Sequence, residues 1–581
     1  MTRTKVLFLC CLALVTTGLR AATPYGVLSS GTLTFYFDDQ MSSRKGSKYT
    51  LDRTDDYPKW HDKASSVTKV VFDSSFAEAR PTNGNYWFDG MTKLTSISGM
   101  ENFNTTEMDS MAYMFSKCKL LTNIDVSHLY TGKAVTMRGM FYNCTGITSL
   151  DLSSFDTRNV DDMMYMFYLC TSLNNVSIGH FNTSKVQYLN GMFFGCSSLK
   201  TVDVSRWDVS EVGTMSMMFY NCNNLTTLDV SNWKTNTLVN IGYMFWSCTS
   251  LQTIDVSGWD TSHVSVANDA FCNCRNVKTL DVGNWATGLF TSTANMFANC
   301  RNVTELDVSG WDMSSVTNAK AMFSNCYKVK TLDVGAWSTT AITDMTDMFN
   351  GCRSLTSLDV SGWDVSGVGS MYAMFCGCGL LTDIDVSDWD VSHVTDMGYM
   401  FYGCKRITSL DMTQWNTWRV TDMMYMMSGC TGLTSLDLSH LDMGKVTSSH
   451  YMLENCTGLK TLSVGKSLEN ADSLAFNGVG TMTTPCKLTV PAGFSFGEDV
   501  DPTEVVFEWK SGFFTLGNEN VYELGDVNID GQVTVTDVML TVNHVLGNKP
   551  EPFYEKYADM NSDGRINVAD IMLIVRKATG Q

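Results

Sequence analysis

Positive charge and histidine are both scarce in this sequence. Its 581 residues carry 41 Lys and Arg against 60 Asp and Glu, with only 8 His, so the net charge at pH 7 is −19. A chain of this sign repels phosphate backbones, and we expect no nucleic-acid binding. The signatures H-E-x-x-H and G-x-S-x-G and the phosphate-binding loop are absent, and the histidines do not form a cluster. We therefore expect no enzymatic activity.

Long hydrophobic runs are also missing after the N-terminus. No later segment reaches the roughly 18 apolar residues of a membrane span, so we expect no integral membrane domain. The chain begins with a basic "MTRTK", an apolar "VLFLCCLALVTTGL" and the small residues of "RAA". This order predicts a signal peptide over residues 1–22 and a secreted, extracellular or cell-surface protein. Cys10 and Cys11 also suggest a lipoprotein, but bulky Leu9 precedes them, so we favour simple secretion.

Cysteine is abundant, and it is periodic. Fourteen cysteines follow one another at one constant interval without a change of phase: Cys118, Cys144, Cys170, Cys196, Cys222, Cys248, Cys274, Cys300, Cys326, Cys352, Cys378, Cys404, Cys430 and Cys456. A fixed period of this length is the signature of a solenoid, in which each repeat is one coil. The chain is also too long for a single compact core.

One repeat, "MGYMFYGCKRITSLDMTQWNTWRVTD", spans residues 397–422. Its first part is apolar at Met397, Met400, Phe401, Cys404 and Ile407, a spacing that predicts one face of a short helix. The second part, shown by "LLTDIDVSDWD" at 380–390, fits the leucine-rich-repeat strand L-x-x-L-x-L-x-x-N with Trp in place of Asn. Alternation along that strand points two apolar residues inward and the polar ones outward, namely Ile384 and Val386 against Asp383, Asp385 and Ser387. We predict an α/β solenoid with one short strand and one short helix per coil.

In such a solenoid the fourteen cysteines form a column on the buried helix face. Stacked side chains run roughly parallel, whereas a disulfide needs side chains that converge, so we favour buried thiols over a disulfide ladder. Methionine, 37 residues in all, fills the irregular gaps beside them. Cys272 and Cys376 lie two positions before ladder cysteines and Cys486 stands alone; we interpret all three as incidental.

The units "YMFYGCKRITSLDM" and "LDVSGWDVS" resemble BspA-type leucine-rich-repeat surface proteins, in the variant with Met-Phe…Cys repeats found in Bacteroidales. The resemblance covers about residues 85–465 and implies a solenoid used for adhesion. Residues 25–82 also look like the leader of that family. We expect an N-terminal β-rich cap at 23–84, the solenoid at 85–465 and a β-rich closing cap at 466–523, where the period breaks.

An aspartate follows the second apolar strand residue in 12 of the 14 units: Asp125, Asp151, Asp203, Asp229, Asp255, Asp281, Asp307, Asp333, Asp359, Asp385, Asp411 and Asp437. Stacked like charges repel, so something must offset them. One interpretation is that each carboxylate bonds the Ser or Thr two positions on and the column is merely solvated. The other is that this face binds a basic protein or peptide, or recruits divalent ions.

The C-terminus contains two calcium-type loops of equal length, "DVNIDGQVTVTD" at 526–537 and "DMNSDGRINVAD" at 559–570. Calcium needs oxygen ligands at loop positions 1, 3, 5, 7, 9 and 12, with Gly at position 6 for the sharp turn. The predicted ligands of two calcium ions are Asp526, Asn528, Asp530, Gln532 (carbonyl), Thr534 and Asp537 in the first loop, and Asp559, Asn561, Asp563, Arg565 (carbonyl), Asn567 and Asp570 in the second.

A helix is expected after each loop, and none clearly precedes the first. This pattern resembles the dockerin domain over residues 524–581 and implies docking onto a cohesin-like protein partner. The recognition positions match Val535, Thr536, Val568 and Ala569, which depart from the Ser-Thr pair of cellulosomes. Alternatively, calcium folds a terminal module that packs on its own chain.

Together these features predict a secreted, surface-associated, non-enzymatic protein. Its solenoid would bind a host or bacterial surface protein or glycan, and its calcium-dependent tail would attach it. The alternative is a structural scaffold whose solenoid is mainly a spacer and whose calcium module only caps the chain.

Overall fold

The computed structural model describes residues 22–51, 57–465, 487–489, 524–528, 532–550, 552–561 and 563–579. Almost all of the expected signal peptide and of the expected closing cap lies outside these residues. The chain divides into two compact units, Met1–Glu211 and Val212–Gln581, which are described separately. Within the described ranges, no helix has both the length and the apolar character needed to cross a membrane.

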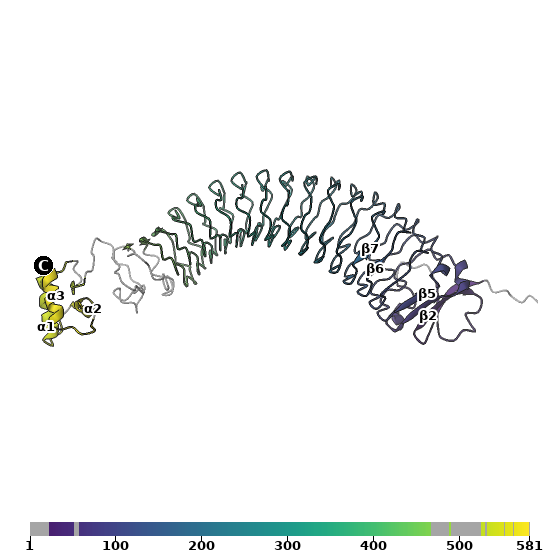
Figure 1. Ribbon diagram of the computed structural model, residues 1–581, viewed down its shortest axis with the longest axis horizontal. Coiled ribbons are helices and arrows are strands. Elements are labelled where there is room, and N and C mark those ends of the chain that lie inside the picture. Colours follow the sequence, from purple (N-terminus) through teal and green to yellow (C-terminus); the bar gives the residue numbers. More distant parts are fainter. Residues whose placement is uncertain are drawn as a thin grey trace, which may run out of the picture. The chain divides into compact units, whose positions relative to one another are not determined.

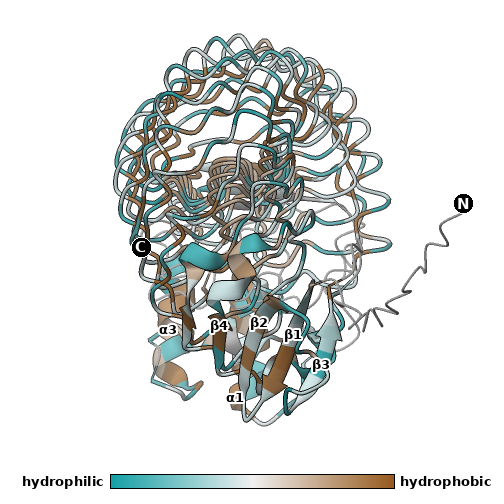
Figure 2. Ribbon diagram, turned by 90° about the vertical axis from the view of Figure 1, so that its right-hand side faces the viewer, coloured by the Kyte–Doolittle hydropathy of each residue, from teal (hydrophilic) through white to brown (hydrophobic). Residues whose placement is uncertain are grey.

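The first unit begins with a mixed sheet of five strands in the order β3-β1-β2-β4-β5. The strands are β1 (Thr23–Ser29), β2 (Thr32–Asp38), β3 (Ser47–Thr50), β4 (Lys69–Phe72) and β5 (Ser96–Ser98). β1 pairs antiparallel with β2 and β3, whereas β4 pairs parallel with both β2 and β5. Figure 2 shows β3, β1, β2 and β4 side by side. Because β5 lies in the first repeat, the sheet passes directly into the solenoid.

Aromatic side chains form the core behind this sheet. Phe35 stacks on Phe72 at 5.1 Å and on Trp87 at 5.2 Å between ring centroids, and Trp60 meets Phe35 edge-on. Three short 3₁₀ helices connect the strands: η1 (His61–Ser66), η2 (Ser74–Glu78) and η3 (Met100–Asn102). Aromatic pairs of this kind add stability beyond their buried area, so the sheet covers the open end of the repeats with a dense apolar layer.

The repeats of both units are coils without α-helix, and Figure 1 shows them as successive turns of ribbon. Alternate backbone N–H groups donate to the next coil, as from Met371 to Asp396 O at 3.0 Å, and from Ala373 to Gly398 O at 2.8 Å. Other N–H groups of the same segment close four-residue turns, as from Met374 to Met371 O. The predicted helix in each coil is therefore wrong.

The backbone geometry explains the error. Ala373 and Gly377, four positions apart, both lie in the left-handed region with φ of 52° and 72°. Two left-handed residues four positions apart interrupt a right-handed helix and turn its N–H groups toward the neighbouring coil. The predicted apolar residues are nevertheless all fully buried: Met397, Met400, Phe401, Cys404 and Ile407. A run of turns with a period of four buries the same positions as a helix face.

The predicted strand face is confirmed, although the strands are short. The described strands are β6 (Ser149–Leu150), β7 (Asn175–Val176), β8 (Ser435–Leu438), β9 (Thr461–Val464) and β10 (Lys487–Thr489), each parallel to its neighbour. Other coils meet through single bridges, such as Thr331 with Ser357. Ile384 and Val386 are buried, and Asp383 and Asp385 are exposed. The fold is a leucine-rich-repeat-like solenoid.

Cysteine and tryptophan link successive coils. The thiol of Cys274 donates to Phe245 O at 3.1 Å, and the indole N–H of Trp285 donates to Val256 O, also at 3.1 Å. All fourteen ladder cysteines are buried and free, as expected. Each donor reaches back along the chain into the preceding coil. Tryptophan, at the position of the consensus Asn, thus supplies a side-chain donor between coils.

The C-terminal module contains three helices, α1 (Val535–Val545), α2 (Glu555–Ala558) and α3 (Val568–Ala578). α1 and α3 are the two helices predicted to follow the loops. They enclose a small core made by Val527, Tyr557, Ala558 and Ile574. A core this small leaves much of the fold to be stabilised by the loops themselves.

Candidate functional site

The second calcium-type loop is built around the buried carboxylate of Asp570. Its Oδ1 accepts the N–H of Met560 at 2.8 Å, and its Oδ2 accepts the N–H of Asn567 at 3.0 Å. Asn567 in turn caps α3 by accepting the N–H of Ala569 at 2.8 Å. The residue at loop position 12 thus joins the start of the loop to the start of the helix.

The residues at the front of this loop also bond its backbone. Asp559 accepts the N–H groups of Asp563 and Gly564 at 3.1 and 2.8 Å, and Asp563 accepts that of Arg565 at 2.9 Å. Gly564 has φ +76°, the left-handed conformation that the sharp turn at position 6 requires. The chain therefore bends so that the oxygen-bearing side chains line one loop.

The first loop repeats this arrangement where it is described. Asp537 Oδ1 accepts the N–H of Val527 at 2.9 Å, and its Oδ2 accepts that of Thr534 at 2.8 Å. Thr534 caps α1 in the same way that Asn567 caps α3. Asp526 is also fully buried. Asp530 lies outside the described residues, so the predicted ligands of this loop are placed only in part.

The donor chemistry of both loops suits a hard cation. The predicted ligands are carboxylate, amide, hydroxyl and backbone oxygens, the set that calcium prefers. Asp537 and Asp570 are fully buried, and neither forms an ion pair with a described residue. Backbone N–H groups offset part of the cost of burying these carboxylates, and a bound cation would neutralise the charge that remains. No group of three or more His, Cys, Asp or Glu is already gathered at one point within the described ranges.

The helices after the loops expose matching apolar side chains. The predicted recognition residues Val535 and Val568 are 67% and 64% exposed, at the starts of α1 and α3. Met539 and Met572, which were not predicted, lie one turn further on and are 57% and 53% exposed. The constant offset between the two loops could have revealed them, since it relates each Val and Met to its counterpart.

The aspartate column is exposed but locally satisfied. Asp307 Oδ1 accepts both the N–H and the hydroxyl of Ser309, at 3.0 and 2.7 Å. These bonds lower the pKa of Asp307 below its ordinary value. The same cause lowers the pKa of six further carboxyls in the column: Asp125, Asp151, Asp255, Asp359, Asp385 and Asp411. The predicted bond to the residue two positions on is confirmed.

The column also borders a surface hollow of about 500 Å³. Its charged lining consists of Asp333, Asp359, Asp383 and Asp385, and the other lining residues are neutral. A carboxylate can accept more hydrogen bonds than those that the protein provides here, so the hollow presents a negative surface to solvent.

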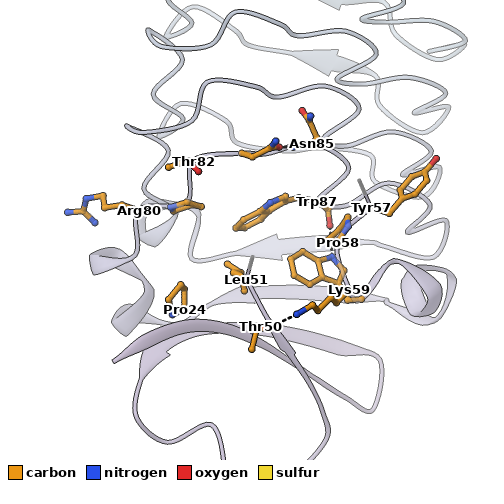
Figure 3. A pocket seen from close by; sticks show the side chains of 13 residues that line it. Pro24, Thr50, Leu51, Tyr57, Pro58, Lys59, Arg80, Thr82, Asn85 and Trp87 are labelled. Atoms are coloured by element: carbon orange, nitrogen blue, oxygen red, sulfur yellow. Dashed lines mark hydrogen bonds between the residues drawn. The ribbon is translucent and has the colours of Figure 1, made fainter. Parts of the chain in front are cut away.

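A second cavity, of about 160 Å³, lies where the N-terminal sheet meets the first repeat. Figure 3 shows Trp87 turned toward its middle and Lys59 turned toward Thr50, whose hydroxyl accepts from Lys59 Nζ at 2.7 Å. Arg80 donates to the backbone oxygen of Ala77. Because three distant segments line this cavity, no local sequence pattern indicates it. Its charged groups are engaged within the protein, and we assign it no ligand.

Two known families match parts of the chain. Residues 82–197, 171–285, 267–383 and 371–473 match a family described as "Mycoplasma protein of unknown function, DUF285". Residues 524–577 match the dockerin type I domain. Dockerin type I domains in general bind calcium. No curated protein matches the chain.

Two solved structures resemble the chain at low identity. A leucine-rich repeat protein from Bacteroides ovatus is 15% identical, covers 81% of this chain and 98% of its own length, and gives a TM-score of 0.33. A leucine-rich repeat protein from Eubacterium ventriosum is 14% identical, covers 67% of this chain and 88% of its own length, and gives a TM-score of 0.29.

Proposed function

This chain belongs to the family described as "Mycoplasma protein of unknown function, DUF285", and from that premise we propose that it is a non-enzymatic binding protein of the cell surface. Its solenoid presents a surface for adhesion, and its C-terminal dockerin domain attaches it to a protein partner. Repeat and dockerin domains are typically binding modules, and dockerin domains are extracellular or surface-associated.

The tail binds two calcium ions, one in each loop, through the twelve predicted ligands. The support is the all-oxygen donor set together with the buried carboxylates Asp537 and Asp570. Calcium supplies the positive charge that these carboxylates lack. The residues themselves fix the starts of α1 and α3, so binding of the metal and the position of the exposed helix surface are coupled.

The docking surface is formed by two Val–Met pairs, Val535 with Met539 and Val568 with Met572. This is the observation that carries the proposal, since these four exposed apolar side chains occupy equivalent positions in the first two turns of α1 and α3. A dockerin domain implies a cohesin-type partner. The apolar character of the surface favours a partner that presents apolar residues, rather than the polar contacts that a Ser-Thr pair would make.

A pull-down with the mature chain, residues 23–581, tests this function. The bait is offered to surface and secreted proteins of the source organism, with calcium or with a chelator. We expect one discrete protein to be captured with calcium only, and capture to fail for a V535D/V568D variant. L546D is the matched control, because Leu546 is 71% exposed but lies at the far end of α1. Calcium binding without any capture would favour the scaffold alternative.

The acidic strand face is the second binding surface of the proposal, and its partner is a basic protein or peptide. The hollow beside Asp333 and Asp359 supports this role. Changing Asp281, Asp307 and Asp333 together to Asn should weaken such binding. If affinity for every tested partner survives that change, the column is not a binding surface.

A further inference from the structure

One turn of the solenoid departs from the acidic character of the chain. The turn directly follows the ladder cysteine, and in four consecutive coils it covers residues 275–279, 301–305, 327–331 and 353–357. These turns carry six cations, which we call the basic strip: Arg275, Lys278, Arg301, Lys328, Lys330 and Arg353. Glu305 is the single carboxylate among the same residues. The strip thus concentrates positive charge on a protein whose net charge is −19.

Two arginines of the strip stack on one tyrosine. The guanidinium carbon of Arg301 lies 5.3 Å from the centre of the Tyr327 ring, and that of Arg353 lies 4.5 Å from it. Cation–π contacts of this kind fix the orientation of an otherwise flexible side chain. Because Arg301 and Arg353 belong to coils on either side of Tyr327, the ring lines up two guanidinium groups along the solenoid axis.

Backbone bonds keep the neighbouring turns in register. Thr304 N–H donates to Lys278 O at 3.3 Å, and Thr356 N–H donates to Lys330 O at 3.1 Å. Asn302 also donates to Arg275 O at 2.9 Å. With about 4.8 Å between adjacent strands, four coils place the cations over about 15 Å. The distance between the cations of successive coils is therefore set by the backbone and not by the flexible ends of the side chains.

The cations of the strip have no carboxylate partner among the described residues. Five of the six are exposed and Arg301 is half-exposed. Arg301 Nε is buried and finds no hydrogen-bond acceptor in the part of the chain that the structure describes. Some surface cations of the solenoid are paired, such as Lys133 with Glu107 at 2.6 Å and Arg138 with Asp162 at 2.7 Å. Unpaired like charges stacked this closely repel, and an anionic ligand would relieve that repulsion.

From this geometry we infer that the basic strip binds a linear anionic polysaccharide, one bearing sulfate or carboxylate groups. The inference deepens the adhesive role proposed for the solenoid and rests on it, but it depends neither on the calcium tail nor on the acidic face. Guanidinium groups recognise sulfate and carboxylate through paired hydrogen bonds, and the ordered Arg301 and Arg353 suit such contacts.

The surroundings of the strip favour a narrow ligand. Asp281, Asp307, Asp333 and Asp359 each come shortly after one of the four turns, so a membrane or a nucleic-acid duplex would meet carboxylates as well as cations. Two arginines already stack on Tyr327, so the ring is a poor platform for stacked bases. The N–H groups of Thr304 and Thr356 are engaged, so a peptide strand cannot add to the backbone there.

Calorimetry with the mature chain, residues 23–581, tests the inference with four probes. They are a heparin-derived oligosaccharide, polygalacturonate, neutral dextran and poly-glutamate. We expect one or both anionic glycans to bind in calcium and in chelator alike, with an affinity that falls as salt is raised. Dextran should not bind. R301Q/R353Q should lose at least about tenfold in affinity, since each arginine contributes a charged hydrogen bond.

The control variant is R419Q/K445Q. It removes two positive charges, as R301Q/R353Q does, but from side chains that stack on exposed Trp418. Its affinity for the glycan should change less than about twofold, because rim charges away from a site contribute little. The inference would be overturned by no binding of either anionic glycan, by an equal loss in the control, or by tighter binding of poly-glutamate. Loss of glycan binding in chelator would also overturn it, by assigning the interaction to calcium. Capture through the tail is a separate readout, so either proposal can fail alone.

Discussion

The thiol of Cys248 donates a hydrogen bond to the backbone oxygen of Phe219 in the preceding coil, with 3.2 Å between sulfur and oxygen. The same bond recurs along both units, for example from Cys170 to Phe141 and from Cys352 to Phe323. Each thiol therefore serves as a small apolar group and as a donor that joins two coils. This explains one ladder cysteine in every coil without any disulfide among the described cysteines.

The buried thiols should make the solenoid sensitive to alkali. Burial raises the pKa of Cys170, Cys248 and Cys352 to about 12, from an ordinary value of 9.0. The folded state then favours the protonated thiol, so its contribution to stability is complete below pH 9 and is lost as pH rises from 9 toward 12. Each such thiol lowers the free energy of unfolding by about 1.4 kcal/mol per pH unit in that window.

Urea unfolding at several pH values between about 8 and 10 measures this effect. A C248A/C352A variant starts from a lower stability, because each change leaves a small cavity. Its free energy of unfolding should nevertheless fall less steeply with pH than that of the parent. The difference between the two slopes should equal the contribution of the two removed thiols. Equal slopes in parent and variant would show that these thiols do not titrate on unfolding.

The tryptophans whose indole N–H groups bond the preceding coil, which we call the tryptophan ladder, should also stabilise the solenoid. Trp311 donates from Nε1 to Val282 O at 3.1 Å, and its side chain is 3% exposed. W311F removes one hydrogen bond, worth about 1 kcal/mol, and leaves a void in the core, for a total cost of about 2–3 kcal/mol. Trp418 is 39% exposed, so W418F is the control and should cost less than about 0.5 kcal/mol. Similar shifts of the urea midpoint in both variants would contradict the role of the ladder.

The pattern of apolar residues predicted what is buried but not how the backbone achieves it. The repeat period, the inward strand residues and the free thiols follow from the spacing of side chains alone. The helix does not, because positions i, i+3, i+4 and i+7 are also buried by consecutive turns. A signal was present in the residue before each ladder cysteine, which is Gly or Asn in 11 of the 14 coils. These residues accept the left-handed conformation, as Asn273 does with φ +66°.

The binding surfaces could likewise be predicted from the sequence only where their residues are close together in the chain or repeat regularly. The calcium-type loops are visible in sequence because their ligands are close together in the chain, and the aspartate column because it repeats. The basic strip combines Arg and Lys at different positions of the turn, and its order depends on Tyr327 stacking between coils. Such a contact arises only when the coils are stacked, so no local pattern predicts it.

In the tail, the structural and metal-binding roles of the aspartates should separate. Asp570 is fully buried and accepts N–H groups from Met560 and Asn567, so D570A should loosen the start of α3 with or without calcium. Asp563 is exposed and at loop position 5, so D563A should weaken calcium binding and leave the calcium-free fold nearly unchanged. Hydrogen exchange of residues 568–578 in the full chain, in calcium and in chelator, distinguishes the two. Equal exchange of both variants in chelator would contradict this division.

Asp269 should destabilise the solenoid at neutral pH, in contrast to the aspartates of the strand face. Its side chain is 7% exposed, and burial raises its pKa above the ordinary value, despite a hydrogen bond from Asn268. A carboxyl whose folded pKa is raised contributes stability below its unfolded pKa and loses it as pH rises through the folded value. D269N should therefore unfold at higher urea than the parent at pH 7, by on the order of 1 kcal/mol. The left-handed backbone at φ +58° also suits Asn, and Asn295 has this conformation at the same position of the next coil. That second gain does not depend on pH, so the difference in stability between variant and parent should shrink but not vanish near pH 3.

D307N is the matched control, and its expected effect has the opposite sign. The pKa of Asp307 is lowered, so its contribution to stability is present at neutral pH and is lost as pH falls through the folded pKa. D307N should consequently lower the urea midpoint at pH 7. A gain for D269N that is the same at both pH values would show that the charge of Asp269 costs nothing in the folded state.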